Sequence, residues 1–87
     1  MSFAVIYEKV VVNEDIPAIP KAEKAPIIRA INERIAVAPL SFGKQLSHGL
    51  TNYRSLRVGN WRIAFRVEGD KVIIAHIDRR RDAYKKW

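Results

Sequence analysis

A short stretch around Gly59-Asn60 limits what this chain can fold into more than any other feature. Glycine and asparagine tolerate a positive φ angle, and the pair stands between residues that alternate in polarity. Such a pair is typical of the two-residue turn of a β-hairpin. The pattern therefore predicts two antiparallel strands in which Val58 pairs with Trp61.

Alternation along these two strands assigns each side chain to one face of a sheet. One face is apolar and is expected to join the core: Leu56, Val58, Trp61, Ile63, Phe65 and Val67. The other face carries Tyr53, Ser55, Arg57, Arg62, Ala64 and Arg66. The register sets Arg57 opposite Arg62, and like charges in this position cost roughly 0.2–1 kcal/mol. We therefore expect an anionic partner on this face.

A second two-residue turn is predicted at Gly69-Asp70, and a third strand over 71–78 follows it. That strand is apolar on both faces, which is typical of a strand inside a sheet. We therefore expect it to lie between 61–68 and an N-terminal strand over 3–7. By strict alternation, Val72 and Ile74 belong to one face, and Ile73, Ala75 and Ile77 belong to the other.

Two helices are predicted between the first strand and the hairpin. Asn13-Glu14-Asp15 offers a start for the first helix, although Val10-Val11-Val12 could extend the strand instead. The second helix is predicted over 21–38, because apolar residues recur there at helical spacing. Pro26 is expected in its first turn or at a kink, and Pro39 ends it. The residues of that apolar stripe are Ile27, Ile28, Ile31 and Ile35.

These elements predict an α+β fold with a single domain over 1–87. The N-terminal strand is followed by two helices packed on one face of an antiparallel meander sheet, and a short helical tail closes the chain. The connector over 40–52 is long for a plain connection, which indicates a binding role.

The charge distribution favours a polyanionic partner. The net charge is +7, yet residues 1–43 hold five basic and five acidic side chains, whereas 44–87 hold eleven basic and four acidic ones. A one-sided basic surface attracts nucleic acid, acidic lipid or an acidic protein. The chain has no cysteine, and no apolar run approaches the ~18 residues of a membrane span. We expect a cytoplasmic protein.

Histidine and cysteine give no metal site, because His48 and His76 have no ligand cluster around them. No cofactor is expected either. By strict alternation, His76 shares the core face with Ile63, so a structural role is predicted for it. His48 lies in the connector, and its role stays open.

Arginine dominates the basic half of the chain, and its planar fork suits bidentate contact with phosphate. Tyr53, Tyr84 and Trp87 lie among these arginines and offer surfaces on which bases could stack. Trp61 and Phe65 are expected in the core instead. The arginines concerned are Arg54, Arg57, Arg62, Arg66, Arg79, Arg80 and Arg81.

Three ordered blocks of sequence resemble the RelE/ParE superfamily of toxins from toxin–antitoxin pairs. They are Gly43-Lys44-Gln45-Leu46, the hairpin stretch Leu56-Arg57-Val58-Gly59-Asn60-Trp61-Arg62-Ile63, and Arg80-Arg81-Asp82-Ala83-Tyr84. The early stretch Asp15-Ile16-Pro17-Ala18-Ile19-Pro20-Lys21 also fits this pattern. The order of strand, helices and meander is similar to that family's fold.

The resemblance implies a ribosome-dependent endoribonuclease that cuts messenger RNA in the ribosomal A site and is neutralised by a cognate acidic antitoxin. It implies that Arg62 grips the scissile phosphate, that Arg80 donates a proton or stabilises charge, and that Tyr84 orients the substrate. Arg57 is the fourth residue expected to act in catalysis. Arg54, Lys44, Arg66, Arg79, Arg81, Lys85 and Lys86 are expected to bind nucleic acid.

Cleavage of this kind uses the 2′-hydroxyl of the RNA as nucleophile and requires neither metal nor cofactor. Arg79 stands where many relatives have histidine, and no general base is evident in the sequence. Two other readings stay open. One is a toxin of the gyrase-inhibiting branch that cuts no RNA, and the other is an RNA-binding module without enzymatic activity.

Overall fold

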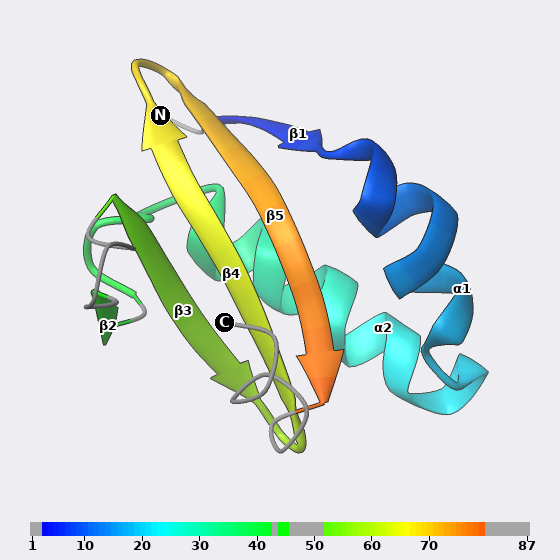
Figure 1. The fold of residues 1–87 in the computed structure, drawn as a ribbon. Coiled ribbons are helices and arrows are strands. Elements are labelled where there is room, and N and C mark those ends of the chain that lie inside the picture. Colours follow the sequence, from blue (N-terminus) through cyan, green and yellow to red (C-terminus); the bar gives the residue numbers. More distant parts are fainter. Residues whose placement is uncertain (1–2, 43, 46–51, 80–87) are drawn as a thin grey trace.

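The structure is a computed structural model that describes residues 3–42, 44–45 and 52–79. Its five-stranded sheet has the order β1-β5-β4-β3-β2, and the helices cover one face of it (Figure 1). The strands are β1 (Ala4–Tyr7), β2 (Lys44–Gln45), β3 (Tyr53–Val58), β4 (Trp61–Glu68) and β5 (Lys71–Arg79). The predicted α+β fold is confirmed. The predicted C-terminal helical tail lies outside the described residues.

Both predicted hairpin turns are present. Val58 pairs with Trp61 across the first turn, and Glu68 pairs with Lys71 across the second. Gly59 and Gly69 have φ angles of 57° and 62°, which residues with a Cβ adopt at a cost of roughly 1–2 kcal/mol. Glycine at these two positions therefore fixes where the strands reverse.

The strand β5 lies between β4 and β1, as its apolar faces predicted. It runs antiparallel to β4 and parallel to β1, with Val5 opposite Val72 and Tyr7 opposite Ile74. The parallel pairing follows from the two helices, which carry the chain from the end of β1 back across the sheet before the meander begins (Figure 1).

The helical region begins directly after β1, so the alternative of a longer first strand is wrong. Residues 9–18 are helical and comprise the π-helical turn η1 (Val11–Asp15) and the short helix α1 (Ile16–Ala18). The next helix, α2 (Lys21–Ala30), continues into a second π-helical turn, η2 (Ile31–Ile35). In each turn a backbone N–H bonds a carbonyl five residues earlier, as Ala36 does with Ile31.

Pro26 lies inside α2, well beyond its first turn, so the predicted place in that turn is wrong. Its side chain is exposed, and so is Ala22, whose carbonyl would have accepted the missing hydrogen bond. Because this side of the helix faces solvent, water can satisfy that carbonyl at small cost. The helix therefore tolerates a proline here.

The hydrophobic core lies between the helices and the covered face of the sheet. The predicted stripe of α2 and η2 supplies Ile27, Ile31 and Ile35, all at most 1% exposed, and Ile28 packs against their cluster. The hairpin supplies Trp61, Ile63 and Phe65, as alternation predicted. The opposite face of β3, β4 and β5, which no helix of the described residues covers, is called the open face below.

A β-bulge divides β5 into two halves. Ala64 of β4 is paired with His76, but the next residue, Phe65, is paired with Ile74, so Ala75 is an extra residue. Strict alternation is interrupted there, and every side chain beyond it changes face. Ile77 joins the core, so its predicted place opposite Val72 and Ile74 is wrong.

The same bulge corrects the prediction for His76. Its partner Ala64 alternates with the core residues Ile63 and Phe65, so His76 belongs to the open face and is half-buried there. The prediction of a core histidine failed because a count of two residues per repeat assumes that a strand has no bulge.

Candidate nucleic-acid interface

The open face carries the arginine pair that the hairpin pattern predicted. Arg57 of β3 and Arg62 of β4 are directly opposite each other, two residues from the Gly59-Asn60 turn. Arg57 is exposed and Arg62 is half-buried. Two guanidinium groups at one cross-strand position form a compact site for an anion, because each offers several N–H donors in a fixed plane.

A carboxylate completes this row on the next strand. Asp78 of β5 is directly opposite Arg62, and it is 6% exposed although it carries a charge. The row from β3 to β5 is therefore Arg57, Arg62 and Asp78, with two positive formal charges and one negative. The carboxylate offsets part of the repulsion between the arginines, because opposite charges on facing strands attract.

The adjacent row of the open face consists of Ser55, Ala64 and His76. Ser55 is 8% exposed and Ala64 is 2% exposed, and the small side chain of Ala64 lies between His76 and Ser55 of β3. Rows on one face of a strand lie about 7 Å apart, because each residue rises about 3.3 Å. Among the described residues, His76 is therefore the titratable side chain in the row next to the arginine row.

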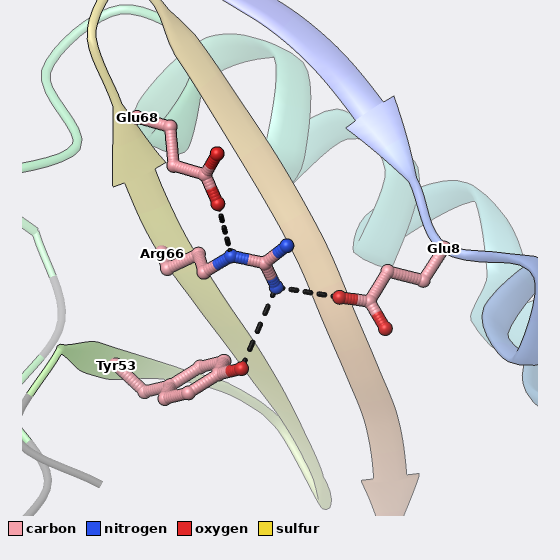
Figure 2. Close-up of polar contacts among 4 residues, drawn as sticks. All are labelled: Glu8, Tyr53, Arg66 and Glu68. Atoms are coloured by element: carbon pink, nitrogen blue, oxygen red, sulfur yellow. Dashed lines mark hydrogen bonds and ion pairs between the residues drawn. The ribbon is translucent and has the colours of Figure 1, made fainter.

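The far end of the open face holds a cluster of four side chains around Arg66 (Figure 2). The guanidinium of Arg66 donates from Nη1 to Oε1 of Glu8 and from Nε to Oε2 of Glu68, each over 2.5 Å. Its Nη1 also lies 3.5 Å from the hydroxyl of Tyr53, and its Cζ is 5.7 Å from the centre of that ring. Figure 2 shows the Arg66 side chain extending from β4 across β5 to reach Glu8.

This cluster is not cationic. The hydrogen bonds that Arg66 donates to Glu8 and then to Glu68 raise the pKa of Arg66 further above its usual range, so the guanidinium stays charged. The two carboxylates together outweigh it by one negative charge. Arg66 stays a predicted nucleic-acid contact, but both carboxylates already occupy donors that a phosphate would use.

Two predicted binding residues lie on the covered side of the sheet instead. Arg54 is paired with the core residue Phe65, and its guanidinium donates to the carbonyls of Phe42 and Leu40 over 3.5 and 3.4 Å. It thereby attaches the chain beyond η2 to β3. Since Arg54 and Arg57 are three positions apart, alternation places the two on opposite faces. Arg54 therefore does not share a face with Arg57, and its contact with nucleic acid stays a prediction.

Arg79 also belongs to the covered side, because it is paired with Trp61 at the end of β5. Its Cζ lies over the Trp61 ring, 5.3 Å from the ring centre, which is the geometry of a cation–π contact. Trp61 also lines a pocket of about 250 Å³, together with Pro26, Ile27 and Val58, among others. This pocket is largely apolar and lies on the other face from the arginine row.

The remaining predicted site residues are not placed by the structure. The backbone of Lys44 is opposite Ser55 in the pairing of β2 with β3. Arg80, Arg81, Tyr84, Lys85 and Lys86 lie outside the described residues. Within the part of the chain that the structure describes, no three histidine or acidic side chains gather in a way that could hold a metal ion. No helix among the described residues is long and apolar enough to cross a membrane.

Two residues of the open face escaped the sequence analysis, namely His76 and Asp78. A signal for them exists in the sequence, because the polar residues of the strand begin at His76 and recur at Asp78. Counted in steps of two, His76 and Asp78 follow Val72 and Ile74, which are buried. A change from buried apolar residues to polar residues along such a series is expected when a bulge lies between them.

A comparison with protein families gives a match over nearly the whole chain. The model of the family described as the ParE toxin of the type II toxin–antitoxin system, parDE, covers residues 6–84. The chain belongs to this family. The protein is therefore a toxin of the RelE/ParE superfamily, as the three sequence blocks indicated. A search of curated proteins found no match for this toxin.

Solved structures of other toxins have the same fold. A chain of the RelBE2 toxin–antitoxin complex of Mycobacterium tuberculosis has a TM-score of 0.84 at 23% identity, over 92% of this toxin and 93% of that chain. The RelB–RelE antitoxin–toxin complex of Methanococcus jannaschii gives a TM-score of 0.69 at 25% identity, over 94% and 98%. The chromosomal ParDE system of Pseudomonas aeruginosa gives 0.63 at 17% identity, over 90% and 96%.

Proposed function

We propose that this toxin is a ribosome-dependent endoribonuclease that cuts messenger RNA in the ribosomal A site. The observation that carries the proposal is the pair Arg57 and Arg62, directly opposite each other on the open face of the sheet. A pair of like charges reduces the stability of the hairpin, so the arrangement is understandable if a phosphate fills the site.

The chemistry requires little beyond position and charge. The 2′-hydroxyl attacks the adjacent phosphorus, and the products are a cyclic phosphate and a 5′-hydroxyl. Arg62, held between its neighbours on β3 and β5, grips the scissile phosphate, and Arg57 stabilises the charge that develops on the pentacoordinate phosphorus. Prearranged donors of this kind contribute most when the site excludes water. The ribosome supplies in-line geometry for the messenger.

A cognate antitoxin is the second partner. Solved relatives in the archaeal and bacterial systems above are complexes of toxin with antitoxin, which supports such a partner for this chain. The basic half of the sequence predicts that the antitoxin is acidic. We expect this toxin to co-purify with a small acidic protein that covers the arginine row. Binding of that protein would keep the cytoplasmic toxin inactive.

The test replaces Arg62 with alanine and compares it with a matched control, Arg34→Ala, which removes an exposed arginine of η2. Messenger cleavage is mapped by primer extension after induction in growing cells. The Arg62→Ala variant should lose translation-dependent cleavage and growth arrest, whereas Arg34→Ala should retain both. Full toxicity of a folded Arg62→Ala protein would exclude the arginine row as the nuclease site.

A second candidate function is inhibition of DNA gyrase without cleavage of RNA. The match to the ParE family model and the fold shared with the ParDE system of P. aeruginosa favour it. Under this alternative, induction elicits a DNA-damage response while transcripts stay intact. Purified toxin would then block supercoiling by gyrase, and primer extension would show no new ends.

A further inference from the structure

We propose that His76 is the general base of the cleavage reaction, which is an inference that rests on the proposed nuclease function. The bulge at Ala75 moves this residue from the predicted core to the open face. There it occupies the row next to Arg57, Arg62 and Asp78, about 7 Å along the sheet. The sequence pattern itself offered no base for this reaction.

Histidine is suited to this step because its imidazole ordinarily titrates between pH 5 and 8, whereas an arginine holds its proton at any physiological pH. A guanidinium in the neighbouring row can hold the phosphate while the imidazole takes a proton from the adjacent ribose. The guanidinium thus supplies a permanent positive charge, and the imidazole supplies a site that can accept a proton.

The step balances without any further reactant. The proton of the 2′-hydroxyl moves to the neutral imidazole of His76 as the bond from O2′ to phosphorus forms. The bond from phosphorus to O5′ breaks, and the departing oxygen takes a proton from water. The imidazolium then returns its proton to solvent, which restores the base.

Among the described residues, the charged groups around His76 come from four elements. On β4 the flanking open-face residues are Arg62 and Arg66, and on β5 the next open-face residue is Asp78. Glu8 reaches Arg66 from the end of β1, and Asp15 of η1 contacts the backbone beside His76 by accepting from the N–H of Ile77. His76 is therefore surrounded by both positively and negatively charged side chains.

The bulge also determines which polar side chains lie next to the arginine pair. The core needs Ile74 and Ile77 on the same side, and a regular strand cannot place residues three apart on one face. The extra residue Ala75 solves this and places His76 and Asp78 together on the open face. Both are thus placed beside the arginine pair by the same local distortion, which is typical of bulges that direct side chains into a site.

The experiment measures single-turnover cleavage of messenger bound in the ribosomal A site with the full toxin chain, from pH 6 to about pH 8.5 around the imidazole range. His76→Gln should lower the rate about 100-fold or more. The ratio of wild-type to variant rate should rise with pH and level off, because the wild type alone gains a neutral imidazole. The matched control Lys71→Gln, at the far end of the same strand, should leave both rate and profile unchanged.

A substrate with sulfur in place of the 5′ bridging oxygen separates base from acid. Sulfur leaves without needing a proton, so loss of a general acid is repaired by this substrate and loss of a base is not. His76→Gln should stay slow on it. Full recovery would assign His76 to the leaving group and overturn the inference, as would unchanged cleavage by His76→Gln on normal RNA.

A second variant protects the test against misfolding of His76→Gln. His48→Gln removes the other histidine of the chain, and the wild-type rise of rate with pH should persist in it. Disappearance of that rise would overturn the assignment to His76. Cleavage that needs Arg62 but not His76 contradicts this inference alone, whereas absence of any cleavage by the wild type contradicts the proposed function itself.

Discussion

Arg62 and Asp78 lie directly opposite each other on β4 and β5, so a nearly buried carboxylate accompanies the central arginine of the open face. This arrangement distinguishes the two arginines of the pair. Arg57, on β3, is exposed and lies beyond the two residues of β3 that pair with β2, whereas Arg62 is half-buried between β3 and β5. Arg62 is thus the better-fixed member of the pair, and Arg57 has more freedom to adjust to a ligand.

Replacing Asp78 with asparagine should reduce the free energy of unfolding by about 1–3 kcal/mol, because it removes a buried charged acceptor opposite Arg62. Chemical denaturation measures the difference. The control Asp70→Asn changes an acid in the exposed β4–β5 turn, where asparagine is also favoured, and should have little effect. An unchanged free energy of unfolding in Asp78→Asn would mean that the carboxylate does not stabilise the fold.

Replacing Arg66 with glutamine should lower the free energy of unfolding by about 1 kcal/mol, since partly exposed ion pairs each contribute at most about that much. The side chains of Arg66 and Glu8 are 26% and 37% exposed, so salt should weaken the contribution. Thermal unfolding at low and high salt measures this. Arg29→Gln, an exposed arginine of α2, serves as control, and equal losses in both variants would contradict a special role of the cluster.

Replacing Asp15 with alanine should loosen the end of β5. Oδ2 of Asp15 accepts a hydrogen bond from the backbone N–H of Ile77 over 3.0 Å, at the edge of β5 beyond the four residues that pair with β1. Hydrogen bonds to charged acceptors contribute about 1.5–3 kcal/mol. Hydrogen exchange at the Ile77 amide should accelerate in Asp15→Ala and not in Glu14→Ala, an exposed acid of the same π-helical turn.

Tyr7 predicts a pH dependence of stability. Burial raises the pKa of Tyr7 above its usual value, because the apolar surroundings disfavour the phenolate. A raised pKa in the folded state means that the full stabilisation is present below about pH 10 and is lost as pH rises through the folded pKa. Melting temperatures from pH 8 to 11 should fall less steeply in Tyr7→Phe. Identical slopes would exclude Tyr7 as the source.

Much of the fold follows from the sequence by itself. Two glycines that favour positive φ determine where the meander turns, and alternation assigns the hairpin side chains, including the facing pair Arg57 and Arg62. The stripe Ile27, Ile31 and Ile35 identifies the covering helix. These features are local, since a turn dipeptide and a repeat of two or 3.6 residues are properties of neighbouring residues.

Other features were decided by the tertiary structure. The bulge at Ala75 lies in a strand that is apolar on both faces, so alternation carries little information there, and the change of face of His76 was missed. The ion pair of Arg66 with Glu8 joins residues 58 positions apart, and no local pattern relates them. The sequence thus determines which side chains are available. The packing of the core against the helices determines which of them share the open face.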